Sequence, residues 1–307
     1  MSNTLAYSIK IPSSDGIHTL SGIVVRPSSG ALRGVLHVVH GMTEHISRYR
    51  DFMRAVAEQG YAVFGYDNLG HGYTAREDEL GYIAPKDGWK YLVGDVLEGK
   101  KYARDAFGDV PYYLMGHSMG SFIVRLAAKE ALPDKLIVMG TGAKNPAADA
   151  ALLLVSLLTK LYGEKHVSSL LETLAFGSYN NRFKADLKVA PKAWLTTLPE
   201  VRERYAKDPF CSYRFTVSAM GDLVRLMKYA NGADFFDGVP ADLPILLVSG
   251  EEDPVGGYGK GVRAVYDTLC AKKKDAKIIL YPTARHEILN DICAERVLSD
   301  ILNFMEK

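Results

Sequence analysis

The sequence predicts an α/β protein with a mostly parallel central sheet, helices on both faces of the sheet, and an inserted helical cap. Short apolar runs rich in β-branched residues alternate with helical patterns in the first half of the chain, and this alternation returns near its end. Between these two regions, residues 144–238 contain helical patterns and no good strand candidate. That interval is far longer than an ordinary connection between strands.

The N-terminal elements are predicted from apolar runs and the turns between them. Residues 7–11 and 20–26 predict two strands joined by a turn that contains Pro, Ser, Asp and Gly. The continuous apolar runs at residues 34–39 and 61–66 are typical of strands that are covered on both faces. Helical spacing over residues 48–59 predicts a helix between them, with Gly60 as its C-cap.

The rest of the core continues the alternation. Strands are expected at residues 112–115, 136–139, 245–248 and 277–280, and helices at residues 89–107, 118–132, 261–271 and 291–305. Strand–helix–strand repeats of this kind predict a parallel sheet. We therefore expect three segments: a first part of the core (1–143), a helical cap insertion (144–238) and a second part of the core (239–307). The cap is expected over the C-terminal edge of the sheet, where open α/β sheets bind ligands.

Composition excludes several classes of function. The 307 residues carry a formal net charge of +1, so there is no global field to attract nucleic acid. Three cysteines without a CxxC pair indicate neither a disulfide framework nor a structural zinc site. The N-terminus has no apolar signal segment, and the longest apolar stretch, residues 150–158, is too short to span a bilayer. We expect a cytoplasmic protein without a metal or cofactor, and the oligomeric state stays open.

The motif that carries the most chemistry is Gly-His-Ser-Met-Gly at residues 116–120. It follows an expected strand and opens an expected helix, which is the context of a nucleophile elbow. We expect Ser118 to project its hydroxyl at the N-terminus of that helix, where the helix dipole favours negative charge. The alternative is that Ser118 only caps the helix.

A serine nucleophile needs a base and an acid, which in this architecture follow it in the order acid, then histidine. Of the eight histidines, only two lie well beyond Ser118. His166 falls inside the helical interval, whereas His286 follows the strand at 277–280, so His286 is the predicted base. Three carboxylates follow the strand at 245–248; Asp253 precedes Pro254 and is the predicted acid, with Glu252 as the alternative.

An oxyanion hole needs two N–H donors, and both are predicted to be backbone groups. One is the N–H of Met119, the residue after the nucleophile. The other is the N–H of Met42, in the loop after the strand at 34–39.

Together these motifs resemble the monoacylglycerol lipase and lysophospholipase group of α/β-hydrolases. The resemblance rests on residues 40–45, 48–49, 60–61, 67–72, 116–120, 250–255 and 285–287, and on two cap stretches, 176–180 and 208–211. It covers nearly the whole chain and implies the α/β-hydrolase fold, with an apolar tunnel under the cap for one acyl chain. It also places the segment of Cys211 near the active site, so Cys211 is a candidate pocket residue; a merely buried cysteine is the alternative.

Within the cap, residues 147–162 form a helical pattern that is apolar on nearly all faces. Such a helix is either buried or in contact with apolar material. One interpretation is packing between cap and core. The other is a wall for an acyl chain that includes Leu153 and Leu157 and makes transient contact with micelles or membranes. We expect the cap to set the preference for chain length without carrying chemistry.

The sequence thus predicts a serine carboxylic-ester hydrolase whose substrate is a small-molecule acyl ester with a single acyl chain, of the monoacylglycerol or lysophospholipid type. The alternatives are an esterase of short or aromatic acyl esters, a peptidase on the same scaffold, and a non-catalytic small-molecule receptor. Epoxide hydrolases and haloalkane dehalogenases of this fold are disfavoured, because they need Asp where Ser118 stands.

Overall fold

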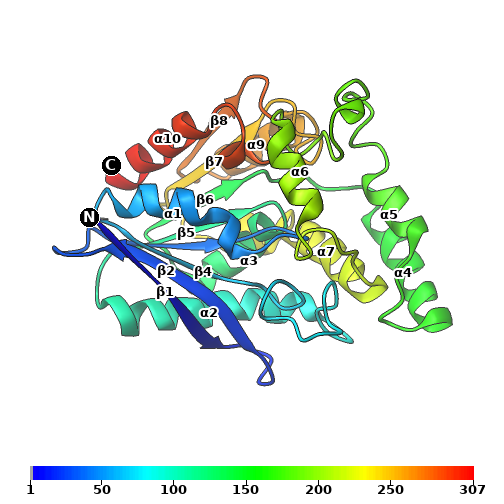
Figure 1. Cartoon of the computed structure of the whole chain (residues 1–307), viewed down its shortest axis with the longest axis horizontal. Coiled ribbons are helices and arrows are strands. Elements are labelled where there is room, and N and C mark those ends of the chain that lie inside the picture. Colours follow the sequence, from blue (N-terminus) through cyan, green and yellow to red (C-terminus); the bar gives the residue numbers. More distant parts are fainter. Residues whose placement is uncertain (1–2) are drawn as a thin grey trace.

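The computed structural model describes residues 3–307 and contains one eight-stranded sheet (Figure 1). Its order is β1-β2-β4-β3-β5-β6-β7-β8. The first two strands form an antiparallel hairpin, β2 pairs antiparallel with β4, and all further pairs are parallel. The bounds are β1 Thr4–Pro12, β2 Thr19–Pro27, β3 Val35–Val39, β4 Ala62–Tyr66, β5 Tyr112–His117, β6 Lys135–Met139, β7 Ile245–Gly250 and β8 Ala276–Tyr281.

Helices cover both faces of this sheet because its central strands are apolar on both sides. Every residue of β3, β4 and β5 is buried. One face packs against α1 and α10, and the other against α2, α3 and α9. Their bounds are α1 Arg50–Ala57, α2 Gly88–Phe107, α3 Met119–Ala131, α9 Lys260–Ala271 and α10 Ala294–Glu306.

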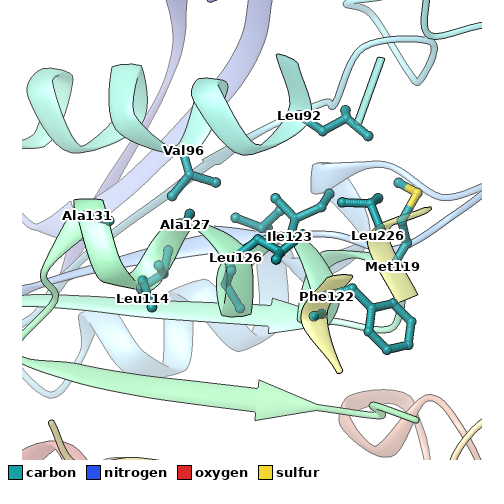
Figure 2. Close-up of a cluster of buried hydrophobic side chains, with 14 of the residues drawn as sticks. Leu92, Val96, Leu114, Met119, Phe122, Ile123, Leu126, Ala127, Ala131 and Leu226 are labelled. Atoms are coloured by element: carbon teal, nitrogen blue, oxygen red, sulfur yellow. The ribbon is translucent and has the colours of Figure 1, made fainter. Parts of the chain in front are cut away.

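The helix α3 is the most deeply buried helix of the core. Eleven of its 13 residues are buried, so it is enclosed by the sheet on one side and by other helices on the other. Figure 2 shows Leu92 and Val96 of α2 pointing toward Ile123 and Ala127 of α3. This packing fixes the N-terminal end of α3, where Ser118 lies.

Between β6 and β7 the chain is helical and contains no strand among its residues, all of which the structure describes. The helices are α4 Ala148–Tyr162, α5 Ser169–Phe176, α6 Pro199–Lys207, α7 Val217–Ala230 and α8 Ala233–Phe236, with the short 3-10 helix η2 at Asp186–Lys188. In Figure 1, α4 to α7 lie at the end of the sheet toward which the parallel strands run. We call residues 144–238 the helical segment.

The fold class predicted from the sequence is confirmed, and each predicted core strand and helix has a counterpart. The expected helix at 48–59 differs in detail, because it begins with a 3-10 turn, η1 Ile46–Tyr49, before α1. The turn after α1 ends at Gly60, whose φ of +93° is a conformation that glycine adopts readily. Among residues 3–307, no helix is both long enough and apolar enough to span a membrane.

Candidate active site

Ser118 lies at a sharp turn between β5 and α3. Its backbone has φ 54° and ψ −118°, a left-handed conformation that costs energy in a residue with a Cβ atom. The surrounding backbone holds the turn in place: the N–H of Ser118 donates to the carbonyl oxygen of Met139 in β6 (2.9 Å). The side chain therefore projects from the C-terminal edge of the sheet at the start of a helix, as the sequence predicts.

The two glycines that flank Ser118 are required by close backbone approaches. A Cβ atom on Gly116 would lie 2.2 Å from the carbonyl oxygen of Gly120. A Cβ atom on Gly120 would lie 2.1 Å from the carbonyl oxygen of Val39 in β3. Both distances are far shorter than a van der Waals contact, so no other residue fits at either position without moving the main chain.

His286 and Asp253 form a direct pair. Nδ1 of His286 lies 2.9 Å from Oδ2 of Asp253, and both side chains are buried. Asp253 follows β7 and His286 follows β8, so adjacent parallel strands deliver both groups to the same edge of the sheet. Glu252, the alternative acid, is half exposed and its Oε2 lies 3.8 Å from Nε of Arg285. The structure therefore pairs His286 with Asp253.

Two further rings contact the imidazole of His286. The ring of His117 has its centroid 4.7 Å away, and the indole of Trp194 has its centroid 5.1 Å away. The main chain adds another contact, because the N–H of Glu287 donates to the carbonyl oxygen of Leu195 (2.7 Å). The loop that carries His286 is thus attached to the helical segment.

Met42 and Met119, the predicted oxyanion donors, line the same cavity as Ser118. Met119 is the first residue of α3, so its N–H has no acceptor within the helix. Within residues 3–307, the N–H of Met42 also has no hydrogen-bond partner. The loop of Met42 lies close to the nucleophile, because a Cβ atom on Gly41 would lie 2.9 Å from Cβ of Ser118.

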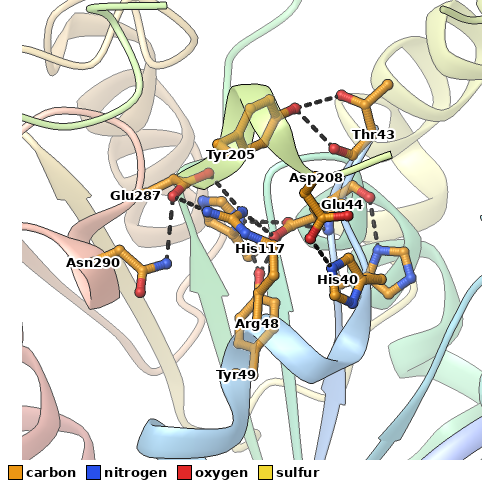
Figure 3. A network of polar contacts seen from close by, with 12 residues as sticks. His40, Thr43, Glu44, Arg48, Tyr49, His117, Tyr205, Asp208, Glu287 and Asn290 are labelled. Carbon is orange, nitrogen blue, oxygen red and sulfur yellow. Dashed lines mark hydrogen bonds and ion pairs between the residues drawn. The ribbon is translucent and has the colours of Figure 1, made fainter. Parts of the chain in front are cut away.

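A buried polar network underlies this loop (Figure 3). Oε1 of Glu44 accepts hydrogen bonds from the N–H of Gly41 (2.6 Å) and from the hydroxyl of Tyr49 (3.0 Å). The same oxygen lies 3.0 Å from Nδ1 of His117, whose Nε2 lies 3.2 Å from the carbonyl oxygen of His286. Glu44 therefore connects three parts of the site. They are the loop of Met42 (residues 40–45, the oxyanion loop), the nucleophile elbow, and the loop of His286 (residues 282–287, the histidine loop). Glu44 lies within the motif at residues 40–45, but nothing in the sequence pattern indicates this role.

Arg48 adds a second connection between the same loops. Its guanidinium donates two hydrogen bonds to Glu287 (2.8 and 2.6 Å) and one to Oε2 of Glu44 (3.1 Å). Glu287 directly follows His286. The network was detectable in the sequence only as charged residues next to motif residues, because its partners are up to 239 positions apart.

The charges in this network shift the pKa values of Glu44 and His117 in opposite directions. Burial alone would raise the pKa of the Glu44 carboxyl, but the hydrogen bond from His117 and the charges of His117 and Arg48 hold it well below its usual range. Burial alone would lower the pKa of His117, but the hydrogen bond and charge of Glu44 outweigh burial and raise it. The two side chains therefore favour an ion pair.

Ser118 and His286 open into a cavity of about 620 Å³, which is within the usual size range of small-molecule sites. Much of its wall is apolar and comes from the helical segment: Ala150, Ala151, Leu154, Val155, Leu171, Leu174, Ala175, Phe176, Met220, Leu223 and Met227. Polar side chains line it beside the oxyanion loop and the histidine loop: Thr43, Glu44, Lys192, Tyr205 and Glu287.

Three predicted pocket residues are not part of this wall. Leu153 and Leu157 are 74% and 54% exposed, because α4 presents Leu154 and Val155 to the cavity and these two leucines to solvent. The structure therefore does not place them on the cavity wall, where the sequence analysis expected them. Cys211 is buried against Leu195 and Tyr205 and does not line the cavity, which fits the alternative of a merely buried cysteine.

Cys211 belongs to a cluster with metal-ligand chemistry. A nitrogen of His45, an oxygen of Asp208 and the sulfur of Cys211 lie within 4.8 Å of one another. However, Asp208 Oδ2 already lies 2.9 Å from Nε2 of His45. Burial also raises the pKa of the Cys211 thiol, whereas a thiol must lose its proton to bind a metal. The cluster therefore fits a metal ion poorly.

The sheet, the elbow and the strand-end loops define the α/β-hydrolase class of protein. Within this class, the chain belongs to the family described as Hydrolase_4: Serine aminopeptidase, S33, whose model matches residues 30–292.

Individual relatives are similar over different lengths. Over 102 residues the chain is 32% identical to "Monoglyceride lipase" of Rattus norvegicus, but this match covers 33% of the chain and 32% of the relative. The chain thus spans about a third of that relative's length. "Monoacylglycerol lipase" of Mycolicibacterium smegmatis is 25% identical over 282 residues, covering 89% of this chain and 88% of the relative.

A solved structure extends the comparison to the whole chain. A thermostable carboxyl esterase from Bacillus coagulans in complex with glycerol superposes with a TM-score of 0.90, at 28% identity, over 98% of each chain. The resemblance to monoacylglycerol lipase-like α/β-hydrolases predicted from the sequence is therefore confirmed.

Proposed function

We propose that the protein is a serine ester hydrolase that cleaves single-chain acyl esters, of the monoacylglycerol or lysophospholipid type. The observation that carries the proposal is the cavity of about 620 Å³, whose apolar wall leads to Ser118 and His286. An acyl chain would gain from leaving water along that wall, at about 0.8 kcal/mol for each buried methylene. The names of the relatives support the same class of substrate.

In the proposed reaction, His286 accepts the hydroxyl proton of Ser118 as Oγ attacks the ester carbonyl carbon. Asp253, paired with Nδ1 of His286, fixes the tautomer of the ring and stabilises the imidazolium. The N–H groups of Met42 and Met119 stabilise the oxyanion of the tetrahedral intermediate. His286 then protonates the leaving alcohol, which yields an acyl-enzyme on Ser118. Water, deprotonated by His286, hydrolyses the acyl-enzyme and restores the serine.

The family description raises a second candidate, an aminopeptidase. Such an enzyme needs a free carboxylate to bind the substrate's ammonium group. The carboxylates that line the cavity already have cationic partners: Glu44 and Glu287 pair with Arg48, and Glu172 pairs with Arg214. This arrangement favours an ester over a peptide with a free N-terminus.

The outer surface of the helical segment suggests how a lipid substrate arrives. Large apolar side chains of α4 and α5 are exposed beside the cavity wall: Leu153, Leu157, Leu161, Tyr162, Leu170 and Leu174. We infer that this surface makes transient contact with micelles or membranes. Leu153, Leu157 and Leu161 recur at every fourth position and so share one face of α4. Exposed apolar patches often mark protein or membrane interaction sites.

A hydrolysis panel tests the proposed function. It contains monoacylglycerols, lysophospholipids, p-nitrophenyl esters of increasing acyl length and aminoacyl anilides, each assayed with wild type and with Ser118→Ala. We expect hydrolysis of single-chain esters, labelling of wild type by a fluorophosphonate, and a loss of at least about 10³-fold in the variant. Ser118→Ala with more than a tenth of the wild-type activity, or anilides as the preferred substrates, would overturn the proposal.

A further inference from the structure

The cavity contains one lysine whose charge has no partner. Among residues 3–307, no hydrogen bond or ion pair is formed by Nζ of Lys192, although this side chain lines the cavity. It lies over the ring of Tyr205, with Nζ 4.7 Å from the ring centroid. The aromatic ring stabilises the positive charge of Lys192. It does not accept hydrogen bonds from all three ammonium N–H groups, so the ammonium can still bind an anion.

The position of Lys192 places this charge at the polar side of the cavity. Tyr205, on which it rests, donates a hydrogen bond to the carbonyl oxygen of Thr43 (2.8 Å), the residue after the oxyanion donor Met42. On its other side, Lys192 is two residues before Trp194, whose ring contacts His286. Lys192 is thus connected to the oxyanion loop through Tyr205 and to the histidine loop through Trp194.

The backbone at Lys192 is also unusual. Its φ is +50°, a left-handed conformation that a lysine rarely adopts. The N–H of Leu195 donates to the carbonyl oxygen of Lys192 (3.0 Å), which closes a tight turn before Trp194. This turn holds the side chain at the cavity, whereas the nearby Lys188 is exposed.

Two neighbouring carboxylates are already paired with other cations. Glu287 and Glu44 both bond to Arg48, and Glu44 is also paired with His117. Burial lowers the pKa of Lys192, while the negative charges nearby oppose that shift. A bound anion would offset the free-energy cost of burying the Lys192 ammonium group.

We infer that Lys192 forms a subsite for an anionic group, a phosphate or a carboxylate, carried by the alcohol part of the ester. The inference rests on the proposed function, since it assigns the polar side of the cavity to the leaving alcohol and the apolar wall to the acyl chain. It narrows the proposed substrate class, single-chain acyl esters in general, to those whose alcohol bears a negative charge.

Three dissolved esters with the same acyl chain test this inference: 1-lauroylglycerol, which is neutral, 3-O-lauroylglycerate, which replaces its terminal CH₂OH by a carboxylate, and 1-lauroylglycerol 3-phosphate. The measurement is kcat/KM of wild type, Lys192→Gln, Lys192→Arg and the exposed control Lys188→Gln. We expect wild type to prefer an anionic ester and Lys192→Gln to lower the anionic-to-neutral ratio roughly tenfold or more, the loss of one hydrogen bond to a charged group.

Lys192→Arg should keep most of that ratio, and Lys188→Gln should leave it at the wild-type value. A preference for only one of the two anionic esters would identify the source of the negative charge and would support the subsite. An equal loss for all three esters in Lys192→Gln, or a wild-type preference for the neutral ester, would overturn it. If wild type hydrolyses none of the three nor any ester of the wider panel, the proposed function itself fails.

Discussion

The indole of Trp194 lies against the imidazole of His286, with ring centroids 5.1 Å apart and planes inclined by 42°. The main chains are also in contact, because the N–H of His286 donates to the carbonyl oxygen of Trp194 (3.4 Å). Trp194 belongs to the helical segment, which the sequence analysis expected to carry no chemistry. The contact indicates that this segment also positions the proposed base, in addition to forming much of the cavity wall.

We predict that Trp194→Ala lowers kcat for a short p-nitrophenyl ester by about 10- to 100-fold, because a small displacement of a catalytic group costs that much. KM for the short ester should change little, since such a substrate does not reach the apolar wall. Trp194→Phe, which keeps a ring against His286, should restore most of kcat. Steady-state kinetics on folded variants, checked by circular dichroism, provide the measurement.

Trp89→Ala is the matched control. Trp89 contacts the ring of Tyr229 (centroids 4.9 Å apart) between α2 and α7 and does not line the cavity. Its removal should reduce stability without a comparable loss of kcat. Equal losses of kcat in the two alanine variants would mean that Trp194 has only a structural role.

A second prediction concerns the acid. Asp253→Asn should reduce kcat by roughly 10⁴-fold, because an amide favours the wrong tautomer of His286. Glu252→Gln changes the adjacent residue in the same way but removes only a distant contact with Arg285, so its effect should be less than about twofold. The reverse order of these two effects would assign the acid to Glu252.

The chain order of the strands explains why so much of the site could be predicted. Ser118, Asp253 and His286 each follow a recognisable apolar run, and parallel strands deliver their C-terminal ends to one edge of the sheet. Gly116 and Gly120 marked the elbow because the local backbone excludes any Cβ atom there. These features are local in sequence, so periodicity and turn residues reveal them.

The residues that could not be predicted depend on tertiary contacts. Residues 147–162 are apolar on nearly all faces, so periodicity could not distinguish Leu154, which lines the cavity, from Leu153, which faces solvent. Trp194 and Lys192 lie in an irregular connection between η2 and α6, where no periodic pattern indicates which side chain faces the site. The pairing of Arg48 with Glu287 likewise joins positions that are adjacent only in the folded chain.

A third prediction is a pH-dependent stability that originates from His117 and Glu44. Because the folded-state pKa of His117 is raised, the stabilisation from its proton is fully present below the pKa of an unfolded histidine, about 6.5, and is lost as pH rises through the folded-state pKa. The Glu44 carboxyl has a lowered pKa and stays ionised over this range. The free energy of unfolding should therefore fall as pH rises above about 6.5.

Denaturant unfolding at several pH values measures the slope of the free energy of unfolding against pH. Glu44→Gln should flatten it, because the variant removes the charge and hydrogen bond that raise the pKa of His117. Glu172→Gln, which changes a carboxylate paired with Arg214 and not with a histidine, should keep the wild-type slope. Parallel pH profiles for wild type and Glu44→Gln would show that this pair does not carry the effect.

The last prediction separates the outer surface of α4 from its cavity surface. Leu153→Ser combined with Leu157→Ser should weaken binding to phosphatidylcholine vesicles by tenfold or more, because each leucine that enters the interface contributes up to about 1.5–3 kcal/mol. Hydrolysis of long-chain esters in micelles should fall with it, while a dissolved short ester should be hydrolysed at the wild-type rate.

Leu154→Ser, one position away, should have the opposite pattern: unchanged vesicle binding and a lower kcat/KM for long-chain esters even below their micellar concentration. Vesicle co-sedimentation and kinetics on both physical states of the substrate would measure the difference. If the two variants lose vesicle binding and long-chain activity in the same proportion, the two faces of α4 do not have the separate roles that their exposure indicates.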